Sequence, residues 1–161
     1  MEALKPQQCN LFHYVGNIEL WQPHKTAFLC SRKTPAAQVL KCYDWAIAMR
    51  DAGTCVMLGA HSQLEKDVLH YLLKGAQPVI LVLARGLMRR MDPDVKTGVR
   101  SGRLLVVTMF GISVRRVTRG TAAARNEFML QHADKVVVGY ADPSGLLKRQ
   151  LALLHRPPKN L

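Results

Sequence analysis

Short apolar runs alternate with longer amphipathic runs along most of this chain, and this alternation is the feature that most limits its fold. The apolar runs are rich in β-branched residues and lack polar alternation, which is typical of strands covered on both faces of a sheet. We expect strands at 25–31 (KTAFLCS), 54–59 (TCVMLG), 78–84 (PVILVLA), 103–110 (RLLVVTMF) and 135–141 (KVVVGYA).

Amphipathic runs with helical spacing lie between and after these strands, and we expect helices at 35–53, 62–75, 121–133 and 144–154. The second helix starts with SQLE, a capping box in which Ser62 and Glu65 satisfy each other's backbone amides. Strands that alternate with helices form parallel βαβ units. The predicted fold is therefore an α/β, Rossmann-like, doubly wound and mostly parallel sheet with helices on both faces.

The length of 161 residues fits one domain. We expect residues 1–24 to form an N-terminal appendage packed on a Rossmann-like domain of residues 25–161. A membrane partner is not expected, because the sequence has no run of about 18 consecutive apolar residues. The start, MEALKPQQCNLF, lacks the basic-then-apolar order of a signal peptide, so we expect a cytoplasmic protein.

Positive charge is concentrated in one part of the chain. The sequence has 23 Lys and Arg residues against 11 Asp and Glu residues, a formal net charge of +12. Between Arg85 and Arg125, ten basic residues face two acidic ones, which leaves a net charge of +8. Such a field attracts phosphate-rich partners, although a solvated basic face that only aids solubility is the alternative. The candidates for contacting a DNA backbone are Arg89, Arg90, Arg115, Arg116 and Arg119.

The loops after the predicted strands are where a ligand would bind, because open parallel sheets bind ligands beyond the carboxyl ends of their strands. Ser31 and Arg32 precede a helix N-terminus, where free amides favour an anion; a capped helix with exposed basic residues is the alternative. His61 is not explained by helix capping, and it either contacts a phosphate or base or hydrogen-bonds a neighbouring loop. Arg125 beside Asn126 suits a nucleotide phosphate or a nucleic-acid backbone.

Several common chemistries lack sequence support. The chain has neither G-x-G-x-x-G nor G-x-x-x-x-G-K-[ST], and it has no G-x-S-x-G nucleophile elbow. No pair of histidines has the spacing of metal ligands. We therefore expect no catalytic residue, no metal and no cofactor.

Four segments of the chain follow one another in a distinctive order: FLCSRKTP, GAHSQLEKDVLHYLLKGAQPVILVLARGL, GRLLVV and RRVTRGTAAARNEFMLQHADKVVVGYA. Together they resemble the Rossmann-like domain of the DNA-processing protein A (DprA) family in the SLOG superfamily. Their order is that of the family's compact, single-domain relatives, and the resemblance covers residues 25–154.

The resemblance implies binding of single-stranded DNA or a nucleotide ligand, in a DNA-processing role such as DNA uptake during natural transformation or recombination. Full-length members of the family pass DNA to a recombinase and often form dimers. The resemblance therefore raises the possibility of a homodimer and of a recombinase partner, and the sequence decides neither. The implied nucleotide or phosphate site consists of Ser31, Arg32, Gly59, His61, Ser62, Arg85, Arg125, Asn126, Ser144 and Gly145.

Two loops depart from the family pattern. Ala60 stands where an aromatic residue is usual, and Pro143 and Ser144 replace a glycine pair; Pro143 supplies no amide donor. A nucleotide-processing enzyme similar to the LOG phosphoribohydrolases is an alternative, but those use a P-G-G-x-G-T loop where this chain has DPSGLLKR. The sequence thus favours a binding protein over an enzyme. A sensor of a nucleotide signal is a further alternative that the sequence does not separate from DNA binding.

Overall fold

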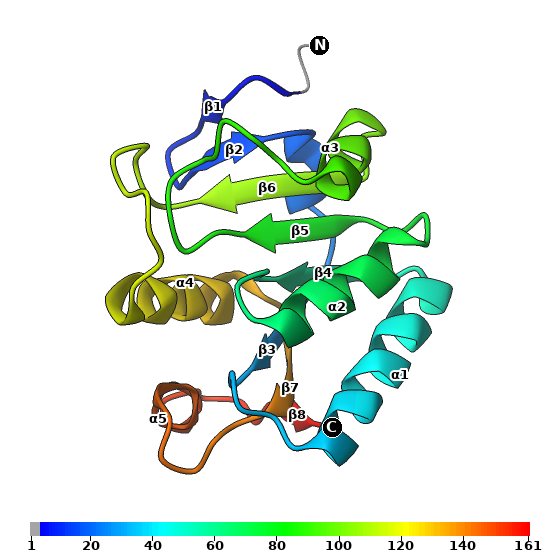
Figure 1. Ribbon diagram of the computed structural model, residues 1–161, viewed down its shortest axis with the longest axis vertical. Helices are drawn as coiled ribbons and strands as arrows, with labels where there is room; N and C mark the ends of the chain where they lie inside the picture. The colour runs from blue at the N-terminus through cyan, green and yellow to red at the C-terminus, as the bar shows by residue number, and fades with distance from the viewer. Residues whose placement is uncertain (1–3) are drawn as a thin grey trace.

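A computed structural model describes residues 4–161 as one eight-stranded sheet between two layers of helices (Figure 1). Across the sheet the strands are β1 (Gln7–Gln8), β2 (His13–Val15), β6 (Leu104–Thr108), β5 (Val79–Val82), β4 (Cys55–Leu58), β3 (Lys25–Cys30), β7 (Lys135–Tyr140) and β8 (Lys159–Asn160). The strands from β6 to β8 run parallel, and only β1 and β2 are antiparallel to their neighbours. The predicted α/β, Rossmann-like fold is confirmed.

The helices lie on both faces of the sheet, as expected for a doubly wound fold. One face is covered by α1 (Ala36–Ala52), α2 (Gln63–Leu73) and α3 (Pro93–Arg100). The other is covered by α4 (Arg119–His132), α5 (Leu146–Ala152) and the short 3-10 helix η2 (Ile18–Trp21). In β4, Val56 and Leu58 pack on the first side, whereas Cys55 and Met57 pack on the second. Burial on both faces explains why the strand sequences are apolar throughout.

The N-terminal residues extend the sheet beyond the five predicted strands. β2 pairs with β6, with Tyr14 opposite Val107, and Phe12 packs edge-on against Phe128 of α4. Strands β1, β2 and β8 were not predicted, because each has only two or three residues and shows no periodic pattern. The division into an appendage of residues 1–24 and a domain of residues 25–161 stays a prediction, and residues 1–3 lie outside the described residues.

Helix α3 was also missed by the sequence analysis. Pro93 and Gly98 suggest a loop, but Pro93 occupies the first turn of the helix, where its missing amide is not needed. Val95 and Val99 are buried against the sheet, and Gly98 allows the helix to approach Leu104 closely. No helix within residues 4–161 is both long and apolar enough to span a membrane.

The strand order places the functional end of the sheet around β3. The chain leaves β3 through α1 toward β4, whereas β7, which ends a crossover through α4, lies on the other side of β3. The loops after β3 and β7 therefore lead to helices on opposite faces, and in open parallel sheets such a switch point is where ligands usually bind.

Candidate functional site

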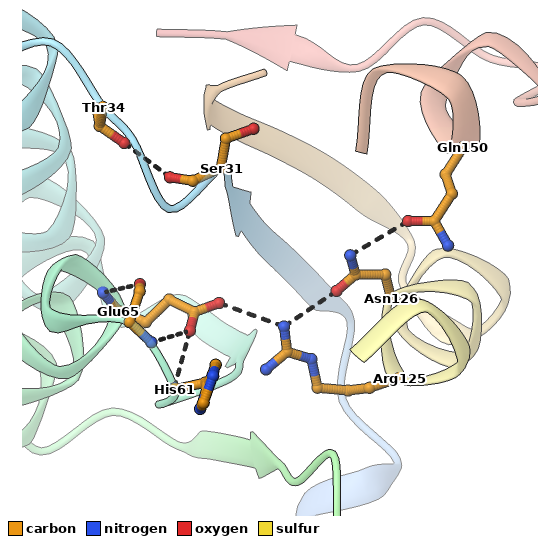
Figure 2. A network of polar contacts seen from close by, with 8 residues as sticks. Ser31, Thr34, His61, Glu65, Arg125, Asn126 and Gln150 are labelled. Atoms are coloured by element: carbon orange, nitrogen blue, oxygen red, sulfur yellow. Dashed lines mark hydrogen bonds and ion pairs between the residues drawn. The ribbon is translucent and has the colours of Figure 1, made fainter. Parts of the chain in front are cut away.

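A buried ion pair lies at the centre of this end of the sheet. Arg125 Nη2 of α4 lies 3.5 Å from Glu65 Oε1 of α2, and the two side chains are only 7% and 5% exposed (Figure 2). The guanidinium lies directly against Gly59 at the end of β4, where any Cβ atom would collide with it. Gly59 therefore leaves room for Arg125, because a Cβ atom at this position would force the guanidinium to move.

Glu65 also holds the turn that leads into α2. Its Oε2 accepts hydrogen bonds from the backbone amides of His61 (2.9 Å) and Ser62 (3.0 Å). Ser62 Oγ accepts from the Glu65 amide at 3.2 Å, which confirms the predicted capping box. The Glu65 carboxylate thus fixes the turn from Gly59 to Ser62. The same carboxylate pairs with Arg125, which comes from the helix on the other face of the sheet.

The polar network continues from Arg125 across α4 to α5 (Figure 2). Arg125 Nη2 donates to Asn126 Oδ1 at 3.1 Å, and Asn126 Nδ2 donates to Gln150 Oε1 at 3.2 Å. Gln150 in turn donates to the Ala123 carbonyl at 2.9 Å. Asn126 therefore links two helices through its side chain.

His61 presents an exposed ring beside this network. Burial of part of the ring lowers the pKa of His61, and the positive charge of Arg32 lowers this pKa further, while Glu65 opposes the shift. These two effects favour the neutral imidazole. In that form it accepts a hydrogen bond at one nitrogen and donates at the other.

A cavity of about 920 Å³ opens between α2, α3 and the loops that follow β5 and β6. Six of the predicted site residues line it: His61, Arg85, Arg90, Arg115, Arg116 and Arg125. The structure thus brings together arginines from two loops and one from α4. Arg125 is 6% exposed, and its Nε has no hydrogen-bond partner among residues 4–161.

The loops after β3 and β7 form a second group of predicted residues. The Asp142 amide donates to Ser31 Oγ at 2.9 Å, and Asp142 Oδ1 accepts from both the amide and the hydroxyl of Ser144. These hydrogen bonds from Ser144 lower the pKa of Asp142. The Gly145 amide donates to the Asp142 carbonyl. The two loops are therefore tied to each other.

The predicted phosphate site is consequently divided into two groups of residues. Among the residues that the structure describes, Ser31, Arg32, Ser144 and Gly145 do not line the cavity. Three further predicted residues are outside the cavity lining and belong to the polar network around Arg125 and Glu65: Gly59, Ser62 and Asn126. Arg89 and Arg119 are exposed but lie outside the cavity lining.

Part of the cavity lining consists of residues that the sequence did not predict. Lys66 and His70 of α2 line it, as do Asp92 and Asp94 at the start of α3. Lys66 and His70 lie four residues apart on one predicted helix, a signal that was available. The part of the cavity wall formed by α3 could not be predicted, because the helix itself was not predicted. Within residues 4–161, no three His, Cys, Asp or Glu side chains gather as a metal ion would require.

The fold and this end of the sheet define a class: Rossmann-like α/β proteins whose basic side chains gather beyond the carboxyl ends of parallel strands. No family model matches the sequence, and no curated protein is detectably similar. Solved structures do match.

One match is DNA processing protein A from Helicobacter pylori, which binds single-stranded DNA; the TM-score is 0.66 and the identity 15%, over 83% of this chain and 62% of that one. DNA processing protein A from Streptococcus pneumoniae matches with a TM-score of 0.66 and 19% identity, over 83% of this chain and 47% of that one. The Moco carrier protein from Chlamydomonas reinhardtii matches with a TM-score of 0.50 and 14% identity, over 86% and 89%. At these identities the likeness establishes a shared fold, and the structural neighbours include the family that the sequence resembles.

Proposed function

We propose that this protein binds single-stranded DNA, or a nucleotide, at its arginine-lined cavity, in a DNA-processing role. The observation that carries the proposal is the convergence of Arg85, Arg90, Arg115 and Arg116 on one cavity beside the buried Arg125. Guanidinium groups bind phosphate oxygens in pairs and stay charged at every working pH. The H. pylori protein that shares this fold binds single-stranded DNA, which supports the same class of ligand here.

The two arginine-bearing loops are held together by the main chain. The Gly86 amide donates to the Val114 carbonyl at 2.8 Å, and Thr108 Oγ1 donates to the Arg85 carbonyl at 2.6 Å. Successive phosphates of one strand would therefore meet arginines that extend from two loops with a fixed backbone. Contacts of this kind position a strand without reading its sequence.

A nucleotide-processing enzyme is supported less well. Glycosidic-bond hydrolysis needs a carboxyl group free to act on the substrate or on water. The buried carboxylate beside the cavity, Glu65, is occupied by two amides and by Arg125, so an enzyme would have to use the exposed Asp92 or Asp94 of the cavity lining. A nucleotide sensor would use the same cavity. The homodimer, the recombinase partner, the link to natural transformation and the cytoplasmic location stay predictions.

The test is fluorescence anisotropy of a labelled single-stranded oligonucleotide, repeated at several salt concentrations. If about four phosphates are neutralised, log affinity falls against log salt with a slope of about −3. The double variant Arg115→Ala/Arg116→Ala should bind at least tenfold more weakly, and its slope should be shallower by about 1.4.

Arg149→Ala is the matched control, because Arg149 is an exposed arginine on α5 outside the cavity lining. Its affinity and slope should equal those of the unchanged protein to within about 0.7 in slope, the contribution of one contact. Absence of binding at low salt would overturn the proposal. So would equal losses in the double variant and the control.

A further inference from the structure

Two cysteine thiols meet between the sheet and α1, away from the large cavity. Cys30 ends β3 and Cys42 lies in α1, and neither lines that cavity. An ideal Cβ atom at Gly139 of β7 would lie 2.6 Å from Cys42 Sγ and 3.1 Å from Cys30 Sγ. The two sulfurs therefore occupy the space beside this glycine, and the Cys42 thiol donates a hydrogen bond to the Cys30 sulfur.

A break in the strand register creates this space. The pairing of β3 with β7 shifts between Leu29 and Cys30, which leaves Gly139 without an opposite residue. The Gly139 carbonyl instead accepts a hydrogen bond from Gln38 Nε2 of α1 at 2.7 Å. Gln38 lies four residues before Cys42 on the same face of the helix. This contact therefore holds the Cys42 thiol against the end of β3.

The two thiols have different surroundings. Cys30 is partly exposed, whereas Cys42 is fully buried. The hydrogen bond from Cys42 lowers the pKa of Cys30, and this effect together with those of Thr34 and the Tyr140 backbone outweighs burial. Thr34 Oγ1 lies 3.2 Å from Cys30 Sγ and 2.8 Å from the Ser31 carbonyl, so its hydroxyl can donate to either (Figure 2). Cys30 is thus the thiol that solvent reaches and that forms a thiolate more easily.

We propose that Cys30 and Cys42 form a reversible dithiol–disulfide site, in which Cys30 reacts with a hydroperoxide and Cys42 closes the disulfide. First, the Cys30 thiolate attacks the terminal peroxide oxygen and the O–O bond breaks. Cys30 becomes a sulfenic acid, and the leaving alkoxide or hydroxide takes up the proton that the thiol lost. Next, the Cys42 sulfur attacks the Cys30 sulfur, the S–O bond breaks, and the hydroxyl group leaves as water with the Cys42 proton. The hydroperoxide thus accepts the two electrons and two protons that the thiols lose.

Oxidation of Cys30 prepares Cys42 for the second step. The hydrogen bond to Cys30 raises the pKa of Cys42, and burial and the negative charge of the Cys30 thiolate raise it further. A sulfenic acid at Cys30 is neutral, so the charge that holds the Cys42 proton is gone. The Cys42 sulfur is already beside its target, which favours attack over the entry of an external thiol.

The other two cysteines serve as internal controls. Cys9 is also partly exposed, but its thiol donates to the Phe12 carbonyl at 3.5 Å instead of to a second sulfur. Cys55 is buried, and its burial raises its pKa to about 11. Exposure alone therefore predicts equal reactivity for Cys9 and Cys30, whereas the proposed pair predicts that Cys30 reacts faster.

The experiment is peptide mapping of the native protein after treatment with stoichiometric hydrogen peroxide. Trypsin places each cysteine on its own peptide, because Lys25, Arg32, Lys41 and Arg50 separate the four. After free thiols are blocked, mass spectrometry should show one dominant cross-link, which joins residues 26–32 to residues 42–50 and disappears on treatment with a dithiol. In the untreated protein, Cys30 should be alkylated about tenfold faster than Cys9.

Three variants separate the two steps. Cys42→Ser keeps a donor beside Cys30 but cannot close the disulfide, so sulfenic acid should accumulate at Cys30 and be trapped by dimedone. Cys30→Ser should leave the buried Cys42 unmodified. Cys9→Ser is the matched control and should form the cross-link at the rate of the unchanged protein. Cys42→Ala, with the same expected dimedone adduct, is used if Cys42→Ser does not fold.

Four results would overturn the proposal. They are a dominant cross-link between any other two cysteines, a cross-link that forms only in urea, alkylation of Cys9 as fast as that of Cys30, and absence of a dimedone adduct when Cys42 is replaced. Because neither cysteine lines the large cavity, these results are independent of whether the protein binds DNA.

Discussion

At the scale of single residues, the pairing of Glu65 with Arg125 connects the two faces of the sheet. The capping role of Glu65 was predictable, because a serine followed three residues later by glutamate is a local pattern. Its contact with Arg125 was not, since the partner lies 60 residues further along the chain and only the folded sheet brings them together. The sequence also left His61 open, and the structure places its exposed ring at the cavity.

Glu65→Gln should destabilise the protein. The substitution keeps the shape of the side chain but leaves Arg125 buried without a counter-charge, which lowers the free energy of unfolding by about 3 kcal/mol. Urea denaturation followed by circular dichroism measures the change. Glu127→Gln on the exposed side of α4 is the control and should stay within about 0.5 kcal/mol. Equal midpoints for Glu65→Gln and the unchanged protein would contradict the role given to the pair.

His61 should make ligand affinity depend on pH. In the free protein, burial and Arg32 lower its pKa. A bound phosphate adds negative charge near the ring and raises this pKa, so the complex takes up a proton. Affinity should then increase as pH falls through the interval between the free and bound pKa values.

The measurement is oligonucleotide affinity between about pH 7.5 and pH 5.5, around the ordinary titration range of histidine. His61→Gln should weaken the pH dependence and leave the part that comes from His70 of the same cavity, whereas His155→Gln, at an exposed position outside the cavity lining, should keep the full profile. A profile that His61→Gln leaves unaltered would place the phosphate away from this ring.

At the scale of elements, the cavity depends on how two loops are attached to the ends of β5 and β6. Thr108 is fully buried at the end of β6, where its hydroxyl donates to the Arg85 carbonyl and accepts from the Phe110 amide at 3.1 Å. Gly86 packs so closely against Gly111 and Ile112 that a Cβ atom there would collide with the Gly111 carbonyl. The two loops that carry the arginines are therefore held together by contacts that involve no charged side chain.

Thr108→Val should disturb both stability and binding. Valine preserves the shape but removes the hydroxyl, which leaves the Phe110 amide without its acceptor and lowers the free energy of unfolding by about 1–2 kcal/mol. Because both arginine loops lose a restraint, affinity for the single strand should fall about threefold to tenfold, that is by about 0.7–1.4 kcal/mol. Denaturation and anisotropy on the same preparation measure the two effects.

Thr97→Val is the matched control for this variant. Its hydroxyl donates to the Pro93 carbonyl within α3, outside the lining of the large cavity. It should alter stability slightly and affinity not at all. If it weakens binding as much as Thr108→Val does, the effect comes from general destabilisation and not from the contacts that hold the two loops together.

At the scale of the whole molecule, hydrophobic periodicity predicted five strands and four helices. Each of these segments is long enough to show its own apolar pattern, independent of distant parts of the chain. The elements that were missed owe their structure to distant partners: β2 to its pairing with β6, and α3 to the burial of Val95 and Val99. The arrangement of the candidate site was likewise not predictable, because it depends on residues that are far apart in the sequence. The charge of +12 is visible in the sequence, whereas the gathering of Arg85 and Arg115 at one cavity requires the strand order.

The outer strands of the sheet have a consequence for how copies of this protein behave beside one another. β1 and β8 are each two residues long, and their four residues, Gln7, Gln8, Lys159 and Asn160, are polar and exposed. A protein collected along a polyanion reaches a high local concentration, where exposed sheet edges template strand-to-strand annealing. Edge strands this short and hydrophilic offer too few backbone hydrogen bonds for a neighbouring copy to add a strand. Crowding of copies along a polyanion should therefore not lead to aggregation through the sheet edges.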